Sequence, residues 1–358
     1  MAEFGIVLAG GFATRLRPLS YTKPKPLLPV LGKPVLDWVI ERVIEVAEPV
    51  VSARYLSTFI KNHVASKWGG RVRVVEEERP LGDGGAVLNV LKTLGVQGPV
   101  VVANGDVYTD IDVKKMWEFH KKMGGVVTIA LIEVPPEETS KFGVAIIDDV
   151  GKIIKFVEKP SQPVGSNLIN AGFYIFEPEA FKGFELNTGE LKIAKNIIPK
   201  ALEKFDVYGY IHRGLWFDIG THVDYLKANF AALDRCTQCR PNIEGVVIHP
   251  PVYIGEGVSI EPGSVLGPYV VLGRGSKIET YVRIRESVLM DGVVVGGGSY
   301  IHGSIVGEGV YIGRWSRVVE AVVSDGVYVR EGVYIGRGSS VGPNREVERD
   351  VKDGEILP

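Results

Sequence analysis

Two absences restrict the partners of this chain. It contains no run of five or more basic residues, and its formal net charge is −2, so nucleic acids and anionic membranes are disfavoured as partners. No apolar stretch reaches the roughly 20 residues that span a bilayer, and residues 1–4 lack the basic segment that begins a secretory signal. We therefore expect a cytoplasmic protein that binds neither nucleic acid nor membrane.

Cysteine is equally scarce. The chain has two cysteines, Cys236 and Cys239, and a structural zinc site would need a second pair of cysteine or histidine ligands nearby. We interpret the pair as two thiols in a connecting segment. A disulfide is the alternative, since some hyperthermophile proteins contain disulfides inside the cell.

What is present is enough for two ordinary domains, because the chain has 358 residues with 45% hydrophobic and 23% charged side chains. Up to residue 235, apolar runs alternate with amphipathic stretches. Strands are predicted over Gly5–Ala9, Val100–Ala103 and Val126–Glu133, and helices over Val35–Ala47 and Val113–Lys122. This alternation indicates an α/β, Rossmann-like domain with a mainly parallel sheet. The loops after residues 9 and 103 are then expected at the active site.

After residue 235 the hydrophobic period changes to six. The aliphatic residues in phase are Ile248, Ile254, Ile260, Leu266, Leu272, Ile278 and Ile284, then Leu289, Val295 and Ile301, then Val306, Ile312 and Val318, and finally Val323, Val329, Ile335 and Val341. Hexapeptide spacing with intervening glycines predicts a left-handed parallel β-helix of about five coils. We therefore expect a first domain over residues 1–235 and a β-helix domain over residues 236–358.

The loop after the first predicted strand has the composition of a phosphate site. Gly10 and Gly11 let backbone N–H groups approach a phosphate without an intervening Cβ, and Arg15 and Lys25 can neutralise a triphosphate. The prolines at 18, 24, 26 and 29 are expected to hold this loop extended. The loop is neither a Walker A loop nor a dinucleotide fingerprint.

The segment from Gly10 to Val30 resembles the signature of the sugar-phosphate nucleotidyltransferase family, Gly-Gly-x-Gly-Thr-Arg-Leu-x-Pro-Leu-Thr followed by Pro-Lys-Pro. Ala13 stands where the family usually has glycine, and Ser20 replaces its threonine. Further motifs that resemble those of the family follow in its order, namely Pro80-Leu81-Gly82-Asp83-Gly84-Gly85-Ala86, Asn104-Gly105-Asp106, Phe142-Gly143-Val144, Val157-Glu158-Lys159-Pro160, Asn170-Ala171-Gly172 and Trp216-Phe217-Asp218-Ile219-Gly220-Thr221. Asp83 occupies a position where the family has threonine.

The resemblance implies an enzyme that makes an NDP-sugar and pyrophosphate from a nucleoside triphosphate and a hexose 1-phosphate. It assigns catalytic roles to Arg15, Lys25, Asp106 and Asp218. It assigns nucleotide binding to Leu8, Ala9, Gly10, Gly11, Thr14, Arg15, Lys25, Glu77, Gly82 and Asp106, and sugar-phosphate binding to Gly143, Glu158, Lys159 and Asn170. Asp106 and Asp218 would hold Mg²⁺, since hard oxygen ligands suit this cation. Each residue also has an ordinary alternative, such as a capping carboxylate or a solvated ion pair.

The later hexapeptides bear on the substrates. Ser304-Ile305-Val306-Gly307 followed by Ile312-Gly313-Arg314-Trp315 resembles the tails of mannose-1-phosphate guanylyltransferases. This favours GTP and mannose 1-phosphate. Glucose 1-phosphate or N-acetylglucosamine 1-phosphate with UTP, dTTP or ATP remains the alternative.

The β-helix has three possible roles. Acyl transfer would need a histidine base, for which His249 and His302 are the candidates. A non-catalytic regulatory subunit would have lost Lys25 or the two metal aspartates, and all three are present. We expect a homo-oligomer assembled through the β-helix, because its aromatic residues exceed what small coils can enclose. These residues are Tyr253, Tyr269, Tyr300, Tyr311, Trp315, Tyr328 and Tyr334; the alternative is that they pack on the catalytic domain of the same chain.

Overall fold

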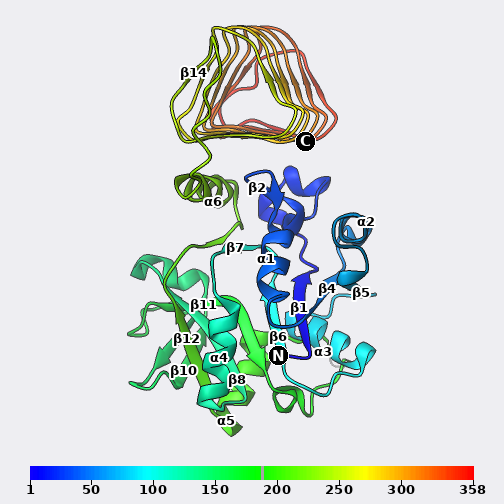
Figure 1. The fold of residues 1–358 in the computed structure, drawn as a ribbon, viewed down its shortest axis with the longest axis vertical. Coiled ribbons are helices and arrows are strands. Elements are labelled where there is room, and N and C mark those ends of the chain that lie inside the picture. Colours follow the sequence, from blue (N-terminus) through cyan, green and yellow to red (C-terminus); the bar gives the residue numbers. More distant parts are fainter. Residues whose placement is uncertain (187–188) are drawn as a thin grey trace. The chain divides into compact units, whose positions relative to one another are not determined.

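The computed structural model describes residues 1–186 and 189–358. The chain forms two compact units, of which the first contains Met1–Gly11 and Val35–Trp216 and the second Phe12–Pro34 and Phe217–Pro358. The loop after the first strand thus belongs to the same unit as the C-terminal part of the chain. Figure 1 draws the sheet of the first unit and the coils of the second. Within the described residues, no helix is long and apolar enough to cross a membrane.

The first unit is built around β1 (Phe4–Ala9), whose side chains are almost all buried. This strand pairs in parallel with β4 (Glu48–Ala53) and with β6 (Val100–Asn104), and β5 (Arg73–Glu76) pairs in parallel with β4. The strands predicted over residues 5–9 and 100–103 are confirmed, each within one residue. The carboxyl ends of these parallel strands therefore lie at the same edge of the sheet.

Beyond β6 the sheet is mixed. β11 (Leu168–Phe176) is antiparallel to β6, to β8 (Val127–Glu133) and to β9 (Gly143–Ile147). β10 (Ile153–Glu158) is antiparallel to β9, and β12 (Val207–His212) is parallel to β8. Together these strands form a nine-stranded sheet, which confirms the Rossmann-like α/β class. The antiparallel pairs were not predicted, because the prediction rested on strands separated by helices. β8 to β11 follow one another without long helices, and such short connections join antiparallel strands.

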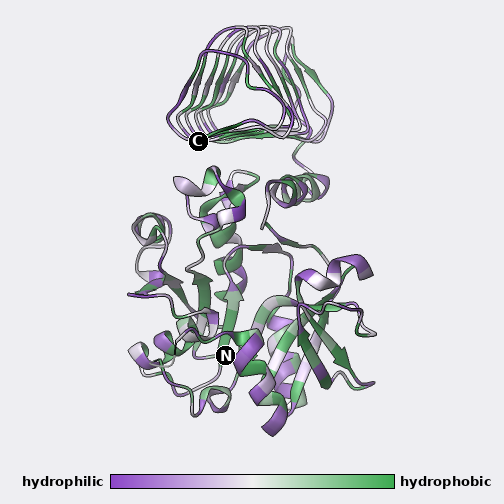
Figure 2. Ribbon diagram, turned by 180° about the vertical axis from the view of Figure 1, so that it is seen from behind, coloured by the Kyte–Doolittle hydropathy of each residue, from purple (hydrophilic) through white to green (hydrophobic). Residues whose placement is uncertain are grey.

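The helices of the first unit are α1 (Val35–Val43), α2 (Ser57–Trp68), α3 (Asp83–Leu94), α4 (Val113–Met123) and α5 (Ile198–Lys204), with short turns η4 (Gly69–Arg71), η5 (Pro136–Lys141), η6 (Pro178–Phe181) and η7 (Ile193–Ile197) and a short strand β7 (Val107–Thr109). Figure 2 shows the hydrophobic residues along the strands that these helices cover. The prediction of helix up to residue 47 was wrong. The backbone N–H groups of Val46 and Ala47 both turn back to the Val43 carbonyl, at 3.1 Å each, and the chain enters β4.

The second unit contains the β-helix, in which three parallel sheets run side by side. The first sheet consists of β14 (Val247–Ile248), β17 (Val265–Leu266), β20 (Arg283–Arg285), β23 (Tyr300–His302), β26 (Arg317–Val319) and β29 (Tyr334–Ile335). The second consists of β15 (Val252–Ile254), β18 (Val270–Leu272), β21 (Ser287–Leu289), β24 (Ile305–Val306), β27 (Val322–Val323), β30 (Ser340–Val341) and β32 (Ile356–Leu357). The third consists of β16 (Ser259–Ile260), β19 (Lys277–Ile278), β22 (Val294–Val295), β25 (Tyr311–Ile312), β28 (Tyr328–Val329) and β31 (Glu346–Val347).

The predicted hexapeptide positions form the interior of these coils. From Leu266 onward every one of them is at most 1% exposed, while Ile248, Ile254 and Ile260 in the first coil are partly buried. Where the period shortens to five, the corner residue adopts a left-handed backbone, as at Glu286 (φ 49°) and Glu320 (φ 47°). The β-helix is confirmed. The expected five coils were too few, because β31 and β32 extend the repeat beyond residue 341.

The remaining elements of the second unit come from the loop and from the chain before the coils. They are η1 (Thr14–Leu16), η2 (Leu19–Tyr21), η3 (Lys25–Leu27), β2 (Pro29–Val30), β3 (Lys33–Pro34) and α6 (His222–Asp234), and β13 (Trp216–Asp218) crosses the boundary between the units. The expectation of a purely extended loop was wrong. Pro18, Pro24 and Pro26 stand at the starts of single 3₁₀ turns, where a missing N–H leaves no hydrogen bond unmade, and Pro29 begins β2.

The interpretation of the two cysteines as free thiols was also wrong. Cys236 and Cys239 form a disulfide, with Cα atoms 5.4 Å apart. The turn between them brings the two side chains together, since the N–H of Cys239 donates to the carbonyl of Cys236 at 3.2 Å.

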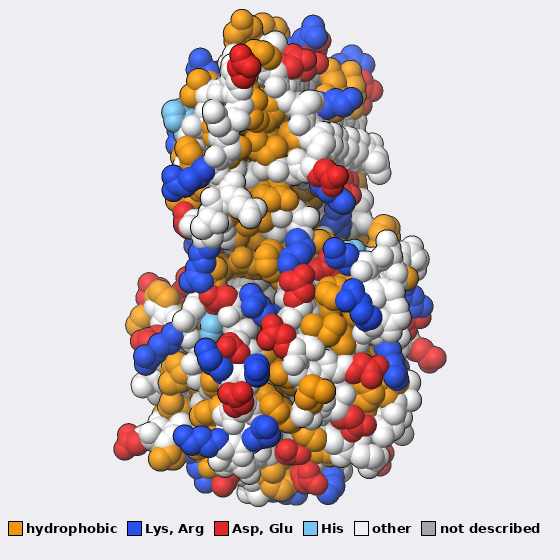
Figure 3. All heavy atoms as spheres, viewed as in Figure 1, with side chains coloured by type: hydrophobic (Ala, Val, Ile, Leu, Met, Phe, Trp, Pro, Cys, Tyr) orange, Lys and Arg blue, Asp and Glu red, His pale blue; other side chains and the backbone are white. Residues whose placement is uncertain are grey.

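The aromatic residues of the coils differ in their surroundings. Tyr269 packs on Phe230 of α6 (ring centroids 5.2 Å apart), and its hydroxyl donates to Asp234. Trp315 and Tyr328, in contrast, are 70% and 48% exposed. Figure 3 shows that basic and acidic side chains are interspersed on the face in view.

Candidate active site

A cavity of about 330 Å³ lies at the carboxyl ends of β1 and β6 in the first unit. It is lined by Leu8, Gly10, Gly11, Arg54, Glu77, Pro80, Gly82, Asp83, Ala86, Asn104, Asp106 and Glu190. Six of the residues predicted to bind the nucleotide are among them, and the cavity occupies the edge of the sheet that the strand order predicts. Ala9 is buried in β1 and does not line the cavity.

The strand register explains why these residues meet. Leu8 of β1 is level with Ser52 of β4 and with Asn104 of β6. The N–H of Gly105 donates to the Leu8 carbonyl at 2.9 Å, and a Cβ at Gly105 would lie 2.8 Å from that oxygen. Only glycine permits this approach, which carries the next residue, Asp106, to the cavity wall.

The two glycines of the turn have different surroundings. A Cβ at Gly10 would lie 2.9 Å from Oε1 of Glu77, whereas no heavy atom lies within 4 Å of a Cβ built at Gly11. Gly10 therefore makes room for a carboxylate, and Gly11 presents open backbone to the cavity. A phosphate can approach that backbone without steric hindrance.

Glu77 places a half-buried carboxylate in the cavity wall. Its N–H donates to Ala53 at 3.0 Å, which continues the β4–β5 pairing, and its Oε1 accepts a hydrogen bond from the Ser52 hydroxyl at 3.1 Å. Burial raises the pKa of Glu77, while the Ser52 hydrogen bond, the Arg54 charge and the Leu81 N–H oppose the rise. Such a carboxylate is a strong, directional hydrogen-bond acceptor.

Asp83, the departure from the family pattern, has a structural role. It begins α3, and its Oδ1 accepts hydrogen bonds from the N–H groups of Gly84 and Ile193, both at 2.8 Å. The preceding Gly82 has φ +76°, and a side chain there would collide with the Leu191 carbonyl. Residues 82 and 83 together hold the 191–193 segment beside the loop that lines the cavity.

A pH dependence follows from this burial, which raises the pKa of Asp83 although the Ile193 and Gly84 hydrogen bonds oppose the rise. Asp83→Asn keeps the accepting oxygen without the buried charge, so its Tm should exceed that of the wild type by about 2–4 °C near neutral pH. The folded pKa lies above the unfolded pKa of about 3.9, so this advantage should disappear below that pH and grow as pH rises through the folded pKa. Thermal unfolding of both proteins across this range measures it, and a constant difference would contradict the assignment.

The predicted sugar-phosphate residues gather at another edge of the same sheet. Glu158 at the end of β10 is level with Gly143 at the start of β9, and a Cβ at Gly143 would lie 2.8 Å from Glu158 Oε2. The N–H of Lys159 donates to the Phe142 carbonyl at 2.9 Å. β11 pairs with β9 through Ile169 opposite Val144, so Asn170 follows and Gly143 precedes this pair. The structure therefore brings all four residues together.

Hydrogen bonds orient the Asn170 side chain. Its Oδ1 accepts from the N–H of Gly172 at 3.0 Å, and its Nδ2 donates to the hydroxyl of Tyr174 at 2.8 Å. Burial raises the pKa of Tyr174 far above its ordinary range, so this hydroxyl stays protonated. Trp216 supports the same region, because its Nε1–H donates to the Ala171 carbonyl at 2.8 Å.

Three of the predicted catalytic residues meet in the second unit. Lys25 Nζ lies 2.6 Å from Asp218 Oδ1, and the Lys25 side chain is only 10% exposed. A Cβ at Gly220 would lie 3.0 Å from Arg15 Nη2 and 3.4 Å from Asp218 Oδ2. Arg15, Lys25 and Asp218 therefore lie close together in the structure. Thr14 is the first residue of η1 and directly precedes Arg15 in the chain.

The same loop explains the usual glycine at the position of Ala13. Ala13 has φ 49°, a left-handed conformation that costs a non-glycine residue about 1–2 kcal/mol. The Ser20 hydroxyl donates to the Ala13 carbonyl at 2.8 Å and holds this turn in place. Ser20, which replaces the family's threonine, therefore supplies a hydroxyl that stabilises this turn.

The residues present fit Mg²⁺ better than a metal that needs many protein ligands. Among residues 1–186 and 189–358, no three His, Cys, Asp or Glu side chains gather into a metal cluster. Asp106 lies in the wall of the cavity, and Asp218 is paired with Lys25. Mg²⁺ keeps several waters and is commonly bound by one or two carboxylates together with substrate phosphates.

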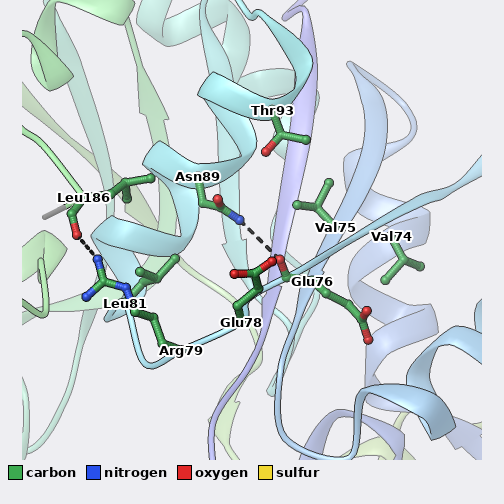
Figure 4. A pocket seen from close by; sticks show the side chains of 9 residues that line it. All are labelled: Val74, Val75, Glu76, Glu78, Arg79, Leu81, Asn89, Thr93 and Leu186. Atoms are coloured by element: carbon green, nitrogen blue, oxygen red, sulfur yellow. Dashed lines mark hydrogen bonds between the residues drawn. The ribbon is translucent and has the colours of Figure 1, made fainter.

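A larger cavity, of about 460 Å³, lies at the edge strand β5 and is drawn in Figure 4. It is lined by Val74, Val75, Glu76, Glu78, Arg79, Leu81, Asn89, Thr93 and Leu186. Asn89 Nδ2 donates to the Glu76 carbonyl at 3.4 Å, and Arg79 donates to the Leu186 carbonyl. None of the predicted site residues lines it, so we assign the active site to the smaller cavity.

Sequence reasoning missed two charged residues of the active-site cavity, Arg54 and Glu190. Arg54 directly follows β4, a strand that we did not predict. Identification of a strand over residues 48–53 would have placed Arg54 at the carboxyl end of the sheet. Glu190 precedes Leu191, and no local pattern marks it.

Comparisons with known proteins identify the family of both halves of the chain. The Nucleotidyl transferase family model matches residues 4–235, and the model named GMPPB C-terminal domain matches residues 248–357. A Sulfolobus acidocaldarius protein, provisionally named a mannose-1-phosphate guanyltransferase, is 37% identical over 72% of this chain and 73% of its own. Mannose-1-phosphate guanylyltransferase 1 of Arabidopsis thaliana is 32% identical over 84% and 85%. The crystal structure of HddC from Yersinia pseudotuberculosis with GMP-PN is similar with a TM-score of 0.52 and 27% identity, over 64% of this chain and 98% of its own.

Proposed function

The chain belongs to the nucleotidyl transferase family, and from this premise we propose that it converts GTP and mannose 1-phosphate into GDP-mannose and pyrophosphate. The observation that carries the choice of base is Glu77, a half-buried carboxylate beside the glycine turn. The sugar is supported by the names of the Sulfolobus and Arabidopsis relatives. The later coils also resemble the tails of guanylyltransferases.

Guanine is the base that a carboxylate recognises best. It presents two neighbouring donors, the N1–H and the exocyclic amino group, and both can donate to one carboxylate. Uracil and thymine place a single N–H between two carbonyl oxygens, which a carboxylate repels. Adenine has an acceptor nitrogen beside its amino group. A site that pairs with a base through buried polar groups rejects bases that leave those groups unpaired.

The chemistry needs charge neutralisation more than a base. The nucleophile is a phosphate oxygen of the sugar 1-phosphate, which is ionised at neutral pH because its second pKa is about 6. This oxygen bonds to the α-phosphorus as the bond to the departing pyrophosphate breaks. Arg15 and Lys25 neutralise the triphosphate, and Lys159 binds the sugar phosphate. Glu158 and Asn170 hydrogen-bond the sugar hydroxyls beside the Gly143 backbone.

We propose that Asp106 and Asp218 hold Mg²⁺. When bound, the cation would supply positive charge at the α-phosphate and help to align the phosphates. The ion pair with Lys25 keeps the Asp218 carboxylate next to the residue that we expect to contact the triphosphate.

Three broader features belong to the same proposal. The chain is divided into a catalytic domain over residues 1–235 and a β-helix over residues 236–358, and it works in the cytoplasm. It assembles into a homo-oligomer through the β-helix, and the exposed Trp315 and Tyr328 support this assignment.

A substrate panel tests the function. Pyrophosphate release should be fastest with GTP and mannose 1-phosphate among GTP, UTP, dTTP and ATP combined with mannose, glucose and N-acetylglucosamine 1-phosphates. Glu77→Gln should lower kcat/KM for GTP by about 10–100-fold, since a buried hydrogen-bonded contact to the base is worth about 1–3 kcal/mol, and should change the values for the other nucleotides much less.

Glu78→Gln is the matched control for this prediction. Glu78 is the next residue along the chain but lines the cavity beside β5, away from the active-site cavity. Its kinetics should equal those of the wild type. If UTP, dTTP or ATP is the preferred substrate of the wild type, the guanylyltransferase assignment is wrong. If Glu77→Gln keeps full selectivity for GTP, Glu77 does not read the base.

A further inference from the structure

The loop of residues 12–34, called the nucleotide loop below, is joined to the β-helix by hydrogen bonds and an ion pair. The Thr22 hydroxyl donates to Asp325 Oδ2 at 2.7 Å, across 303 residues of sequence. Lys23 forms an ion pair with Glu308, and the Lys23 side chain is only 13% exposed. The buried Ser324 hydroxyl donates to the carbonyl of Pro18 at 3.2 Å. All these residues belong to the same compact unit.

Asp325 is one of several aspartates with the same position in the coils. Oδ1 of Asp291, Asp325 and Asp353 accepts a backbone N–H from the preceding coil, at 2.8, 2.7 and 2.9 Å respectively. The second oxygen differs. In Asp291 it binds the guanidinium of Arg274, within the β-helix. In Asp325 it accepts the hydroxyl of Thr22 from the nucleotide loop, so this contact is additional to what the coil needs.

Helix α6 holds the other end of the nucleotide loop. The hydroxyl of Tyr225 donates to the Pro29 carbonyl at 2.6 Å, and Oδ1 of Asn229 accepts from the N–H of Leu31 at 3.1 Å. Both side chains are fully buried. In Figure 1, α6 and β2 lie next to the coils of their own unit. Lys25 thus lies between residues 18–23, which contact the β-helix, and residues 29–31, which contact α6.

We propose that the β-helix is a positioning element for nucleotide binding, in which Asp325, Glu308 and Ser324 fix the loop that carries Arg15 and Lys25. The physical reason is the composition of the loop. The part that carries Arg15 and Lys25 consists of single 3₁₀ turns, each closed by its own short hydrogen bonds, so contacts outside these turns hold the cationic groups in place. Groups held in advance lose less entropy when the triphosphate binds. The proposal rests on the proposed function for the identity of the ligand.

The central variants are Thr22→Val, which keeps the shape and removes the hydroxyl, and Asp325→Ala. Each should raise the dissociation constant for GTP with Mg²⁺ about tenfold, the loss expected for one hydrogen bond to a charged group. The KM for the sugar phosphate should not change, because its predicted residues lie in the other unit. The double variant should bind GTP about as weakly as the weaker single variant, since both single variants remove the same Thr22–Asp325 hydrogen bond.

Two controls separate positioning from general destabilisation. Thr22→Ser retains the hydroxyl and should bind GTP like the wild type. Asp291→Ala removes the same coil hydrogen bond as Asp325→Ala but touches no residue of the loop in the described contacts. It should therefore leave GTP binding unchanged.

Hydrogen exchange without any nucleotide tests the coupling separately from activity. The amides of Leu27 and Leu28, which donate within the loop, should exchange about tenfold faster in Thr22→Val and Asp325→Ala than in the wild type and Asp291→Ala. Unchanged exchange overturns the proposal, whatever the enzyme assay gives. Faster exchange with unaltered GTP binding overturns the positioning role. A wild type that exchanges as expected but neither binds nor uses GTP would instead refute the proposed function.

Discussion

Asp106→Asn should lower the rate of nucleotidyl transfer by more than about a hundredfold while the protein stays folded. Removal of one preorganised electrostatic contact to a developing charge costs about that much. Asp106 lies in the wall of the active-site cavity, carried there by the close approach of Gly105 to Leu8. The asparagine keeps the size of the side chain and removes the charge that would hold Mg²⁺.

Asp218→Asn should have a loss of the same size, and here asparagine is a better choice than alanine. Alanine would remove the carboxylate that lies 2.6 Å from the buried ammonium of Lys25, and loss of one partner of a buried ion pair is destabilising. The amide oxygen of asparagine can still accept from Lys25. A loss of activity can then be attributed to the carboxylate charge.

Magnesium titrations measure both effects. The wild type should be inactive with EDTA and recover with added Mg²⁺, while the variants should need far more Mg²⁺ or not recover. Asp112→Asn is the control, because Asp112 caps α4 by accepting from the N–H of Lys115 at 2.8 Å and should leave the kinetics intact. Near-native turnover of either site variant at the same Mg²⁺ concentration would show that its aspartate is not a metal ligand.

Hydrophobic periodicity was the strongest guide to the fold. The six-residue period identified the inward positions of the coils, because one aliphatic side chain per hexapeptide fills the interior of a β-helix. Val295, Ile312 and Val329, for example, are all fully buried. Continuous apolar runs likewise located β1 and β6. The strand predicted over residues 126–133 is β8, whereas β9, β10, β11 and β4 were missed, because their connections carry no helix-length pattern or their ends carry charge.

Contacts between residues far apart in the chain could not be predicted from local pattern. Glu77 and Gly10 are neighbours only because β5, β4 and β1 stand side by side. The contact between Thr22 and Asp325 joins the nucleotide loop to a coil near the other end of the chain. Motif resemblance identified Lys25 and Asp218 separately. It did not indicate that they form an ion pair.

Lys25 and Lys159 should affect different kinetic constants, since they occupy different places in the structure. Lys25→Met should lower kcat at saturating nucleotide by more than about a hundredfold, because a charge that acts mainly on the transition state changes the maximum rate more than ground-state binding. Lys159→Ala should mainly raise the KM for the sugar phosphate, because Lys159 lies beside Gly143, Glu158 and the hydrogen-bonded Asn170.

Steady-state kinetics with each substrate varied in turn distinguish the two roles. Lys155→Ala is the control for Lys159→Ala, since Lys155 is an exposed residue of β10, the strand that Lys159 directly follows, and the variant should leave every constant unchanged. Lys25→Met combined with Asp218→Asn should lose less than the product of the two single losses, because the residues are in direct contact at 2.6 Å and share one function. If Lys25→Met raised only the KM for the nucleotide, and Lys159→Ala lowered kcat with its KM unaltered, the two roles would be exchanged. Losses that multiply in the double variant would mean that Lys25 and Asp218 act independently, with Asp218 serving the metal and Lys25 the phosphates through separate contacts.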